Sequence, residues 1–301
     1  MVKTDDIEFI ILCGGRSTRN YPHTKGIPHK ALLPFGSKRI IDYILSEIIK
    51  IGGKNITIVC SSEKVADDFR VALASDIEVY EKLKTKNAFI AENLEETFLP
   101  GTVNVRYVIQ SLPKGTAHAI GLAHNISEDK NAVVIFPDDI YFSAPDKPNQ
   151  LSRLIEDFRR DDKQILLSGI VMDDVSNVSV LENGRLIEKP KHPTSNVGGF
   201  SPMLLPKAVC DLMSVLAERI ENGETVPEMR SDGECCYVDA INSFLDNSYN
   251  KYFAKMLIKA DDTEYFDAGN IMAYEKLMLR GLLAYSKFKD ENKEYAASFL
   301  R

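Results

Sequence analysis

Apolar runs and amphipathic stretches alternate along the first half of the chain. Residues 7–13 form a short run rich in β-branched and aromatic side chains that ends at Gly14 and Gly15, which predicts a buried strand. In residues 39–51, isoleucine and leucine recur at helical spacing and stop at Gly52, which predicts a helix with a C-terminal glycine. The same patterns predict strands over 55–60, 103–109, 132–136 and 164–172, and helices over 62–74, 115–125 and 151–160. This alternation is typical of an α/β fold with a mostly parallel sheet and helices on both faces.

The pattern changes after Val178. Short runs on either side of Asn183-Gly184 predict a small β-hairpin insertion, because Asn-Gly favours the type I′ turn. Residues 82–98 resemble a charged helical insertion, and helices are expected over 207–222 and 270–287. No internal repeat or Gly/Ser-rich linker divides the chain. We therefore expect one domain over 1–301 with a helical C-terminal tail.

Composition excludes several classes of protein. The 301 residues are 44% hydrophobic and carry a net charge of −7, which favours a globular protein and argues against nucleic acid as a partner. No apolar run approaches the roughly 18 residues of a membrane span, and residues 1–6 lack the apolar core of a signal peptide. The five cysteines are odd in number and form no C-x-x-C, so we expect neither a disulfide framework nor a zinc site. A cytoplasmic location without a membrane partner fits best.

The segment between residues 12 and 34 carries the clearest chemical signal. A predicted strand runs into Gly14 and Gly15, and such a loop can direct backbone N–H groups toward a phosphate. Four basic residues within this segment add positive charge to an acidic chain: Arg16, Arg19, Lys25 and Lys30. A surface loop with solvated charges is the alternative interpretation. The segment contains neither the Gly-Lys-Ser/Thr of a P-loop nor G-x-G-x-x-G.

This segment resembles sugar-1-phosphate nucleotidyltransferases. Their pattern, G-G-x-G-T-R followed by P, T-K, P-K and L-P, is matched by Gly14 to Arg19, Pro22, Thr24-Lys25, Pro28, Lys30 and Leu33-Pro34. Two positions depart from the pattern: Ser17 replaces a glycine, and His29 is inserted before Lys30. We match Lys30 by its distance from Pro34, and Lys25 would take its role if His29 turned Lys30 away.

Later motifs resemble the bacterial UTP–glucose-1-phosphate uridylyltransferase (UDP-glucose pyrophosphorylase) branch of this family. They follow the family's order and begin at Gln110 (Q-x-x-x-x-G), Asp138, Glu188 (E-K-P-K), Gly233 (G-E-x-x-x-x-D-A-I) and Phe266 (F-D-x-G). The resemblance implies a Rossmann-like fold, the nucleotide-diphospho-sugar transferase fold. It also implies that residues 7–175 mainly bind nucleotide, residues 176–270 mainly bind sugar and residues 271–301 form the tail.

The resemblance also implies a role for each matched residue. Nucleotide would be bound by Cys13, Gly14, Gly15, Gln110 and Gly115, with the Gln110 amide reading the pyrimidine edge. Catalysis would use Arg19 and Lys30 on the triphosphate tail and Lys189 on the sugar phosphate. The sugar would contact Gly169, Glu188 and Lys189, and Mg²⁺ would be held by Asp138 and Asp267 with Asp139 in reserve. The reaction is attack of a sugar-1-phosphate oxygen on the α-phosphorus of UTP, which releases pyrophosphate.

Several alternatives stay open at this point. Asp138 and Asp267 are also suited to capping a turn or a helix, and the Gln110 amide does not separate UTP from dTTP. Val178-Ser179 and Ser201 depart from the family pattern near the expected hexose site, so another hexose 1-phosphate is open. A non-catalytic sugar-nucleotide-binding protein and a nicotinamide dehydrogenase are competing classes. We expect packing or surface roles for His118 and His124, core positions for Cys235-Cys236, and a homo-oligomer.

Overall fold

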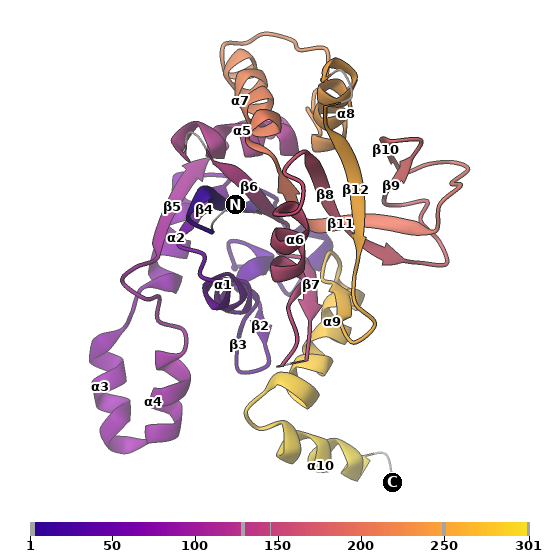
Figure 1. The fold of residues 1–301 in the computed structure, drawn as a ribbon. Helices are drawn as coiled ribbons and strands as arrows, with labels where there is room; N and C mark the ends of the chain where they lie inside the picture. Colours follow the sequence, from indigo (N-terminus) through magenta and orange to yellow (C-terminus); the bar gives the residue numbers. More distant parts are fainter. Residues whose placement is uncertain (1–3, 128–129, 145, 249–250, 300–301) are drawn as a thin grey trace.

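A nine-stranded sheet forms the centre of the part of the molecule that the computed structural model describes, residues 4–127, 130–144, 146–248 and 251–299 (Figure 1). Its path runs β10-β9-β11-β6-β1-β4-β5, and β8 pairs with β11 and β12. The strands are β1 (Ile7–Cys13), β4 (Asn55–Cys60), β5 (Asn104–Ile109), β6 (Asn131–Ile135), β8 (Gln164–Val171), β9 (Ser179–Glu182), β10 (Arg185–Glu188), β11 (Val197–Leu205) and β12 (Phe253–Ile258). Two small sheets pair β2 (Pro34–Phe35) with β3 (Lys38–Arg39) and β7 (Asp139–Phe142) with β13 (Glu264–Asp267).

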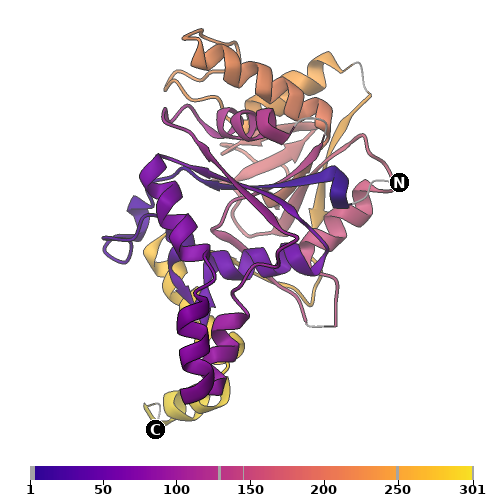
Figure 2. The same ribbon diagram turned by 90° about the vertical axis from the view of Figure 1, so that its left-hand side faces the viewer.

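Helices cover both faces of the sheet, as Figure 2 shows from the side. The helices are α1 (Ile40–Lys50), α2 (Glu63–Leu73), α3 (Ile77–Lys86), α4 (Ala88–Glu95), α5 (Thr116–Ser127), α6 (Gln150–Phe158), α7 (Lys207–Glu221), α8 (Tyr237–Asn247), α9 (Ile271–Arg280) and α10 (Lys289–Phe299). Side chains of β1 alternate between two cores. Phe9 and Ile11 pack with α1, α2 and α6, whereas Ile10 packs with α5, α7 and α8. The predicted fold class is therefore confirmed.

Parallel pairing gathers several chain reversals at one edge of the sheet. Strands β5, β4, β1 and β6 are mutually parallel, and Cys13, Cys60 and Ile109 lie side by side at their carboxyl ends. The segments that follow β1, β5 and β6 therefore leave the sheet at the same edge. In open α/β sheets this edge is where ligands bind. Next to β6, strand β11 runs antiparallel and begins the second half of the sheet.

The predicted hairpin is present, and two helix predictions need correction. Asn183 and Gly184 have φ values of 49° and 77°, as the type I′ turn requires. The expected helix over 82–98 is instead the pair α3 and α4, because Asn87 ends one helix and its side chain caps the next. The expected helix over 270–287 ends at Arg280, and a π-helical turn follows over Gly281–Tyr285. A Cβ on Gly281 would lie 2.8 Å from the Gly36 nitrogen, so only glycine allows this contact.

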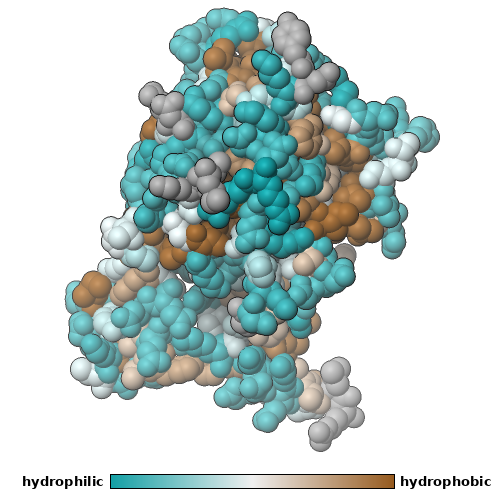
Figure 3. Space-filling model, in the orientation of Figure 1, coloured by the Kyte–Doolittle hydropathy of each residue, from teal (hydrophilic) through white to brown (hydrophobic). Residues whose placement is uncertain are grey.

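The surface carries both hydrophilic and hydrophobic regions. The face drawn in Figure 3 is mostly hydrophilic, and hydrophobic atoms gather on it near the edge strand β12. Phe253 and Ile258 of this strand are exposed. Within the described ranges, no helix is long and apolar enough to cross a membrane.

Candidate active site

An open groove of about 310 Å³ lies at the carboxyl edge of the parallel strands. Its walls come from the segments after β1, β5 and β6 and from one residue of the 233–241 motif. The lining includes Gly14, Gly15, Lys30, Gln110, Gly115, Thr116, Phe136, Asp138 and Glu234. The structure thus brings together motifs that are as much as 220 residues apart, from Gly14 to Glu234.

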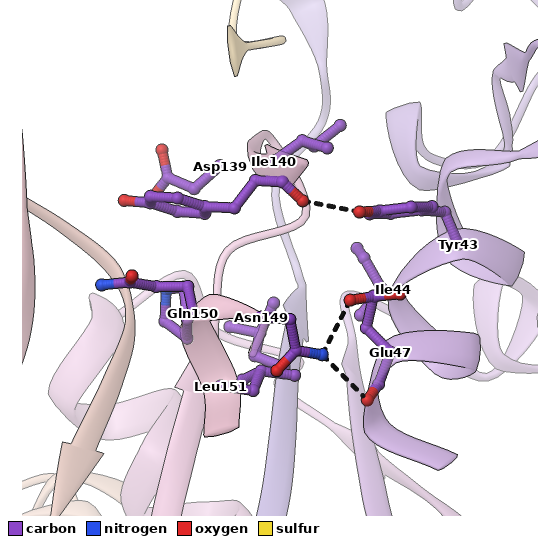
Figure 4. Close-up of a pocket in the computed structure, with 11 residues that line it drawn as sticks. Tyr43, Ile44, Glu47, Asp139, Ile140, Asn149, Gln150 and Leu151 are labelled. Atoms are coloured by element: carbon purple, nitrogen blue, oxygen red, sulfur yellow. Dashed lines mark hydrogen bonds between the residues drawn. The ribbon is translucent and has the colours of Figure 1, made fainter. Parts of the chain in front are cut away.

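A second hollow lies behind strand β7 and is drawn in Figure 4. Its volume is about 40 Å³, which has room for water but not for a nucleotide. Two hydrogen bonds join polar groups across it: the Tyr43 hydroxyl donates to the Tyr141 carbonyl at 2.6 Å, and the Asn149 amide donates to Glu47 at 2.7 Å. The hydrogen bond from Tyr43 holds strand β7, which follows Asp138, and the hollow is too small to be a substrate site.

The glycine-rich loop is held by a serine at the position where the family has glycine. Ser17 adopts φ 52° and ψ 30°, the left-handed conformation that glycine adopts most easily. Its hydroxyl accepts a hydrogen bond from the Lys30 backbone N–H at 3.0 Å, and its carbonyl accepts one from the Thr24 hydroxyl at 3.0 Å. The hydroxyl group therefore ties the loop directly to the backbone of Lys30.

The inserted His29 does not turn Lys30 away from the groove. The His29 ring is only 1% exposed, and its Nδ1 accepts a hydrogen bond from the Ala31 N–H at 3.1 Å, which caps the short 3₁₀ turn Lys30–Leu32. Burial, together with the positive charge of Lys30, lowers the pKa of His29 to about 3 and keeps the ring neutral. Lys25 is exposed.

Lys30 forms the central ion pair of the groove. Its ammonium lies 2.5 Å from Asp138 Oδ2, and both side chains are mostly buried, with 13% and 18% of their surfaces exposed. Side by side, an ammonium group is suited to bind a phosphate and a carboxylate is suited to bind a cation.

A second carboxylate and a second cation meet beside this pair. A Cβ on Gly269 would lie 2.7 Å from Asp267 Oδ1, 3.2 Å from Asp138 Oδ2 and 3.4 Å from Arg19 Nη2. Asp267 Oδ1 also accepts the Gly269 N–H at 2.6 Å. The two carboxylates therefore border one point, which fits the two-carboxylate set that magnesium uses together with phosphate oxygens. Within the described part of the chain, no cluster of three or more His, Cys, Asp or Glu side chains could hold a metal by itself.

Asp139 is engaged in hydrogen bonds to neighbouring strands. Its carboxylate accepts hydrogen bonds from the Ser201 N–H at 2.9 Å and from the Tyr265 hydroxyl at 2.8 Å. Burial, and secondarily the negative charge of Asp138, raises the pKa of Asp139 to about 7. In the register of β7 and β13, Asp139 lies opposite Asp267. Asp139 therefore ties β7 to β13 through Tyr265 and to β11 through Ser201.

Gln110 and Gly115 lie together at the other end of the groove. The Gln110 amide nitrogen donates to the Gly115 carbonyl at 2.9 Å. Gly115 has φ 94°, and a Cβ there would lie 2.4 Å from the Cys235 carbonyl oxygen, so the loop depends on glycine. Of the two cysteines predicted in the core, Cys235 is buried and Cys236 is half-buried. The Cys235 carbonyl accepts the Ala117 N–H at 3.0 Å. Cys13, predicted to bind nucleotide, is also buried and is not among the residues that line the groove.

The residues predicted to bind sugar lie on the second half of the sheet. Glu188 ends β10 and accepts a hydrogen bond from the Ser179 hydroxyl at 2.7 Å, and Ser179 also lies 3.0 Å from the Tyr237 hydroxyl. Lys189 follows with φ 48° and an exposed side chain. A Cβ on Gly169 would lie 3.0 Å from Val197 Cγ1, so side chains of the sheet already fill the space beside this glycine.

Sequence reasoning missed several residues that shape the site. Ser201, noted only as a departure from the family, is fully buried, and its hydroxyl accepts the Phe136 N–H at 2.8 Å. Thr116 and Glu234 line the groove. His118 is buried, as packing predicts, but it also bonds to Gln110. Only Glu234 carried a signal in the sequence, because it belongs to the Gly233-Glu234 motif.

The chain is similar to known proteins along most of its length. The nucleotidyl transferase family model matches residues 8–276. A Bacillus subtilis protein with a provisional name as UTP–glucose-1-phosphate uridylyltransferase is 30% identical over 285 residues, which cover 89% of this chain and 94% of that protein.

Two solved structures share the fold. A UDP-glucose pyrophosphorylase from Acinetobacter baumannii has a TM-score of 0.79 at 20% identity, covering 97% of this chain and 99% of its own. A structure from Bacillus anthracis, provisionally named a glucose-1-phosphate thymidylyltransferase, has a TM-score of 0.62 at 21% identity, covering 92% and 95%. The family match spans most of the chain, both halves of the sheet and every motif of the groove, and this chain belongs to the nucleotidyl transferase family.

Proposed function

We propose that this chain joins UTP and glucose 1-phosphate to give UDP-glucose and pyrophosphate. The observation that carries the proposal is the group of charged side chains at the groove, where the Lys30–Asp138 pair meets Asp267 and Arg19 around Gly269. A reaction between two polyanions needs such charges more than it needs a general base. The name of the Bacillus subtilis relative supports the choice of substrates.

The chemistry is a displacement at phosphorus. An anionic oxygen of the sugar phosphate attacks the α-phosphorus, the bond from that phosphorus to the bridging oxygen breaks, and pyrophosphate leaves with the electron pair. Lys30 and Arg19 stabilise the charge that develops on the leaving pyrophosphate. Lys189 holds the sugar phosphate in line, and Glu188 accepts hydrogen bonds from sugar hydroxyls.

Asp138 and Asp267 are the residues that would hold Mg²⁺. When bound, the cation supplies positive charge to the phosphate oxygens. Asp139 holds β7 against β11 through Ser201 and against β13 through Tyr265. The chain's own contribution is to keep both carboxylates beside one point and to release Asp138 from Lys30 as phosphate arrives.

Gln110 and the backbone at Gly115 would bind the base. Glu188 and Lys189, on the second half of the sheet, would bind the sugar phosphate. We propose that residues 7–175 mainly bind nucleotide and residues 176–270 mainly bind sugar. Ser179, where the family pattern differs, anchors Glu188 through its hydroxyl and so leaves the carboxylate available at the sugar side. Thymine presents the same edge as uracil to Gln110, so dTTP is the competing nucleotide.

A pyrophosphate-release assay tests the proposal directly. UTP, dTTP, ATP, GTP and CTP are each combined with a panel of hexose 1-phosphates in the presence of Mg²⁺. We expect the highest kcat/KM for UTP with glucose 1-phosphate. A higher value for dTTP or for another hexose would change the substrate and keep the enzyme class. Binding of sugar nucleotides without release of pyrophosphate from any pair would contradict catalysis altogether.

A further inference from the structure

The Gln110 amide has a fixed direction in the groove. Its nitrogen lies 2.9 Å from the Gly115 carbonyl oxygen and 3.1 Å from His118 Nδ1. A carbonyl oxygen only accepts hydrogen bonds, so the side of the amide that faces Gly115 must be the nitrogen. Both N–H groups are thereby used inside the protein. The amide oxygen points the other way, and a Cβ on Gly14 in the groove would lie 3.0 Å from it.

The direction of the amide in turn sets the tautomer of His118. Because the Gln110 nitrogen donates, His118 Nδ1 must accept, and the ring proton lies on Nε2. That nitrogen is 2.9 Å from Glu221 Oε1, which is an acceptor. His118 is fully buried on α5, and burial lowers its pKa, which keeps the ring neutral. Glu221 is the last residue of α7, and its side chain is 47% exposed.

We propose that His118 and Glu221 are positioning residues that hold the Gln110 amide as a hydrogen-bond acceptor toward the nucleotide base. The inference rests on the proposed function of Gln110 as the base reader. An oxygen in this place accepts the N3–H of uracil or thymine, whereas N3 of cytosine carries a lone pair and repels it. The relay from Glu221 through His118 to Gln110 therefore selects UTP or dTTP against CTP, although neither His118 nor Glu221 needs to touch the base.

Helices α5 and α7 also carry a second histidine–carboxylate pair, His124 and Asp211, which is not connected to Gln110. His124 on α5 lies 3.1 Å, through Nε2, from Asp211 Oδ1 on α7, and the Asp211 side chain is also 47% exposed. The Nδ1 atom of His124 is buried without a hydrogen-bond partner among the described residues. Changes at Asp211 therefore control for any general effect of disturbing the contact between α5 and α7.

The first test is the ring tautomer itself. Long-range ¹H–¹⁵N NMR of histidine-labelled protein, assigned with His118→Gln, distinguishes a proton on Nε2 from one on Nδ1. We expect His118 to carry its proton on Nε2. A proton on Nδ1 would overturn the inference, because that nitrogen could not accept from Gln110.

The second test is the ratio of kcat/KM for UTP to kcat/KM for CTP, with dissociation constants for both nucleotides measured in parallel. We expect His118→Leu to lower this preference at least about tenfold, because the amide loses a partner that fixes its direction. His118→Gln, which keeps an acceptor, should restore most of the preference. Glu221→Lys replaces the acceptor with a donor at an exposed position and should also lower it, while Asp211→Lys should leave it unchanged.

The outcomes separate the inference from the proposed function. If Gln110→Ala leaves the preference for UTP over CTP unchanged, Gln110 is not the base reader and the proposed role of Gln110 fails. If Gln110→Ala lowers the preference while Glu221→Lys and a folded His118→Leu keep it, only the relay is wrong. If His118→Leu does not fold, Glu221→Lys against Asp211→Lys decides, and equal preferences in these two variants would overturn the inference.

Discussion

The groove around Lys30 and the segment Glu188-Lys189 on the second half of the sheet are built differently. In the groove, Lys30 and Asp138 neutralise each other at 2.5 Å, and both are mostly buried. On the second half of the sheet, Glu188 is held by Ser179, but Lys189 is exposed and makes no ion pair among the described residues. The first region is preorganised by paired charges, whereas the second fixes its carboxylate and leaves its cation unpaired. Under the proposed function, the first region would stabilise the leaving pyrophosphate and the second would bind the sugar phosphate.

The largest effect is expected from the two carboxylates beside Gly269. Asp138→Asn and Asp267→Asn should each lower kcat by at least about 10²-fold, because each change removes a negative charge that is needed to hold the cation at the phosphates. Steady-state kinetics with Mg²⁺ varied would measure this, and EDTA should abolish the activity of the unchanged protein. The exposed Asp290→Asn serves as the matched control. Near-normal turnover in EDTA, or in either folded variant, would contradict the metal assignment.

Lys30→Ala should separate the proposed triphosphate site from the proposed sugar site. We expect kcat to fall by roughly 10²-fold with little change in either KM, since the contact strengthens as pyrophosphate leaves. Lys25→Ala is the comparison, because its exposed side chain would matter only if it had taken the role of Lys30. A larger loss in Lys25→Ala than in Lys30→Ala would reverse the assignment.

Lys189→Ala should affect the proposed sugar site instead. We expect KM for glucose 1-phosphate to rise about tenfold, with a smaller fall in kcat from lost alignment and little change in KM for UTP. Varying each substrate in turn measures the three quantities. A rise in KM for UTP alone would show that the roles proposed for Lys30 and Lys189 have been assigned the wrong way round.

The smallest effect concerns stability rather than turnover. Burial lowers the pKa of His29 to about 3 in the folded chain. Between pH 6.5 and pH 3, His29 is therefore mostly protonated in the unfolded chain and neutral in the folded chain. The stability that this histidine contributes is therefore present above pH 6.5 and is lost as the pH falls, by about 2 kcal/mol at pH 5. Urea unfolding measures the free energy of unfolding at pH 7.5 and at pH 5. Its decrease between these two pH values should be smaller in His29→Asn, which keeps a capping oxygen, than in the unchanged protein. The exposed His192→Asn should keep the full decrease.

Much of the fold could be predicted because its buried strands are short apolar runs with glycine at their ends. Strand β1 and helix α1 have the expected bounds to within one residue. The pairing of β7 with β13 could not be predicted, because these four-residue strands carry little pattern and meet only through tertiary structure. Helix α8 and strand β12 were missed in the region after residue 222, where the alternation of strand and helix breaks down.

The groove was predictable where a motif follows a parallel strand. The segments after Cys13 and Ile109 leave the same edge of the sheet on strands separated only by β4, and their motifs had assigned both Gly14 and Gln110 to the nucleotide. Contacts between helix faces were not predictable in this way. His118 and Glu221 are 103 residues apart and meet because α5 packs on α7, a fact that neither helix reveals alone.

The Lys30–Asp138 pair has a thermodynamic consequence. A cation that approaches Asp138 has to displace an ammonium group, and a phosphate that approaches Lys30 has to displace a carboxylate, so each ligand alone bears the whole cost of separating the pair. When both arrive together that cost is incurred once. The two affinities are then linked by a coupling free energy of the same size in both directions. The free energy of binding a metal–nucleotide complex should therefore be more favourable than the sum of the free energies for binding metal and nucleotide separately.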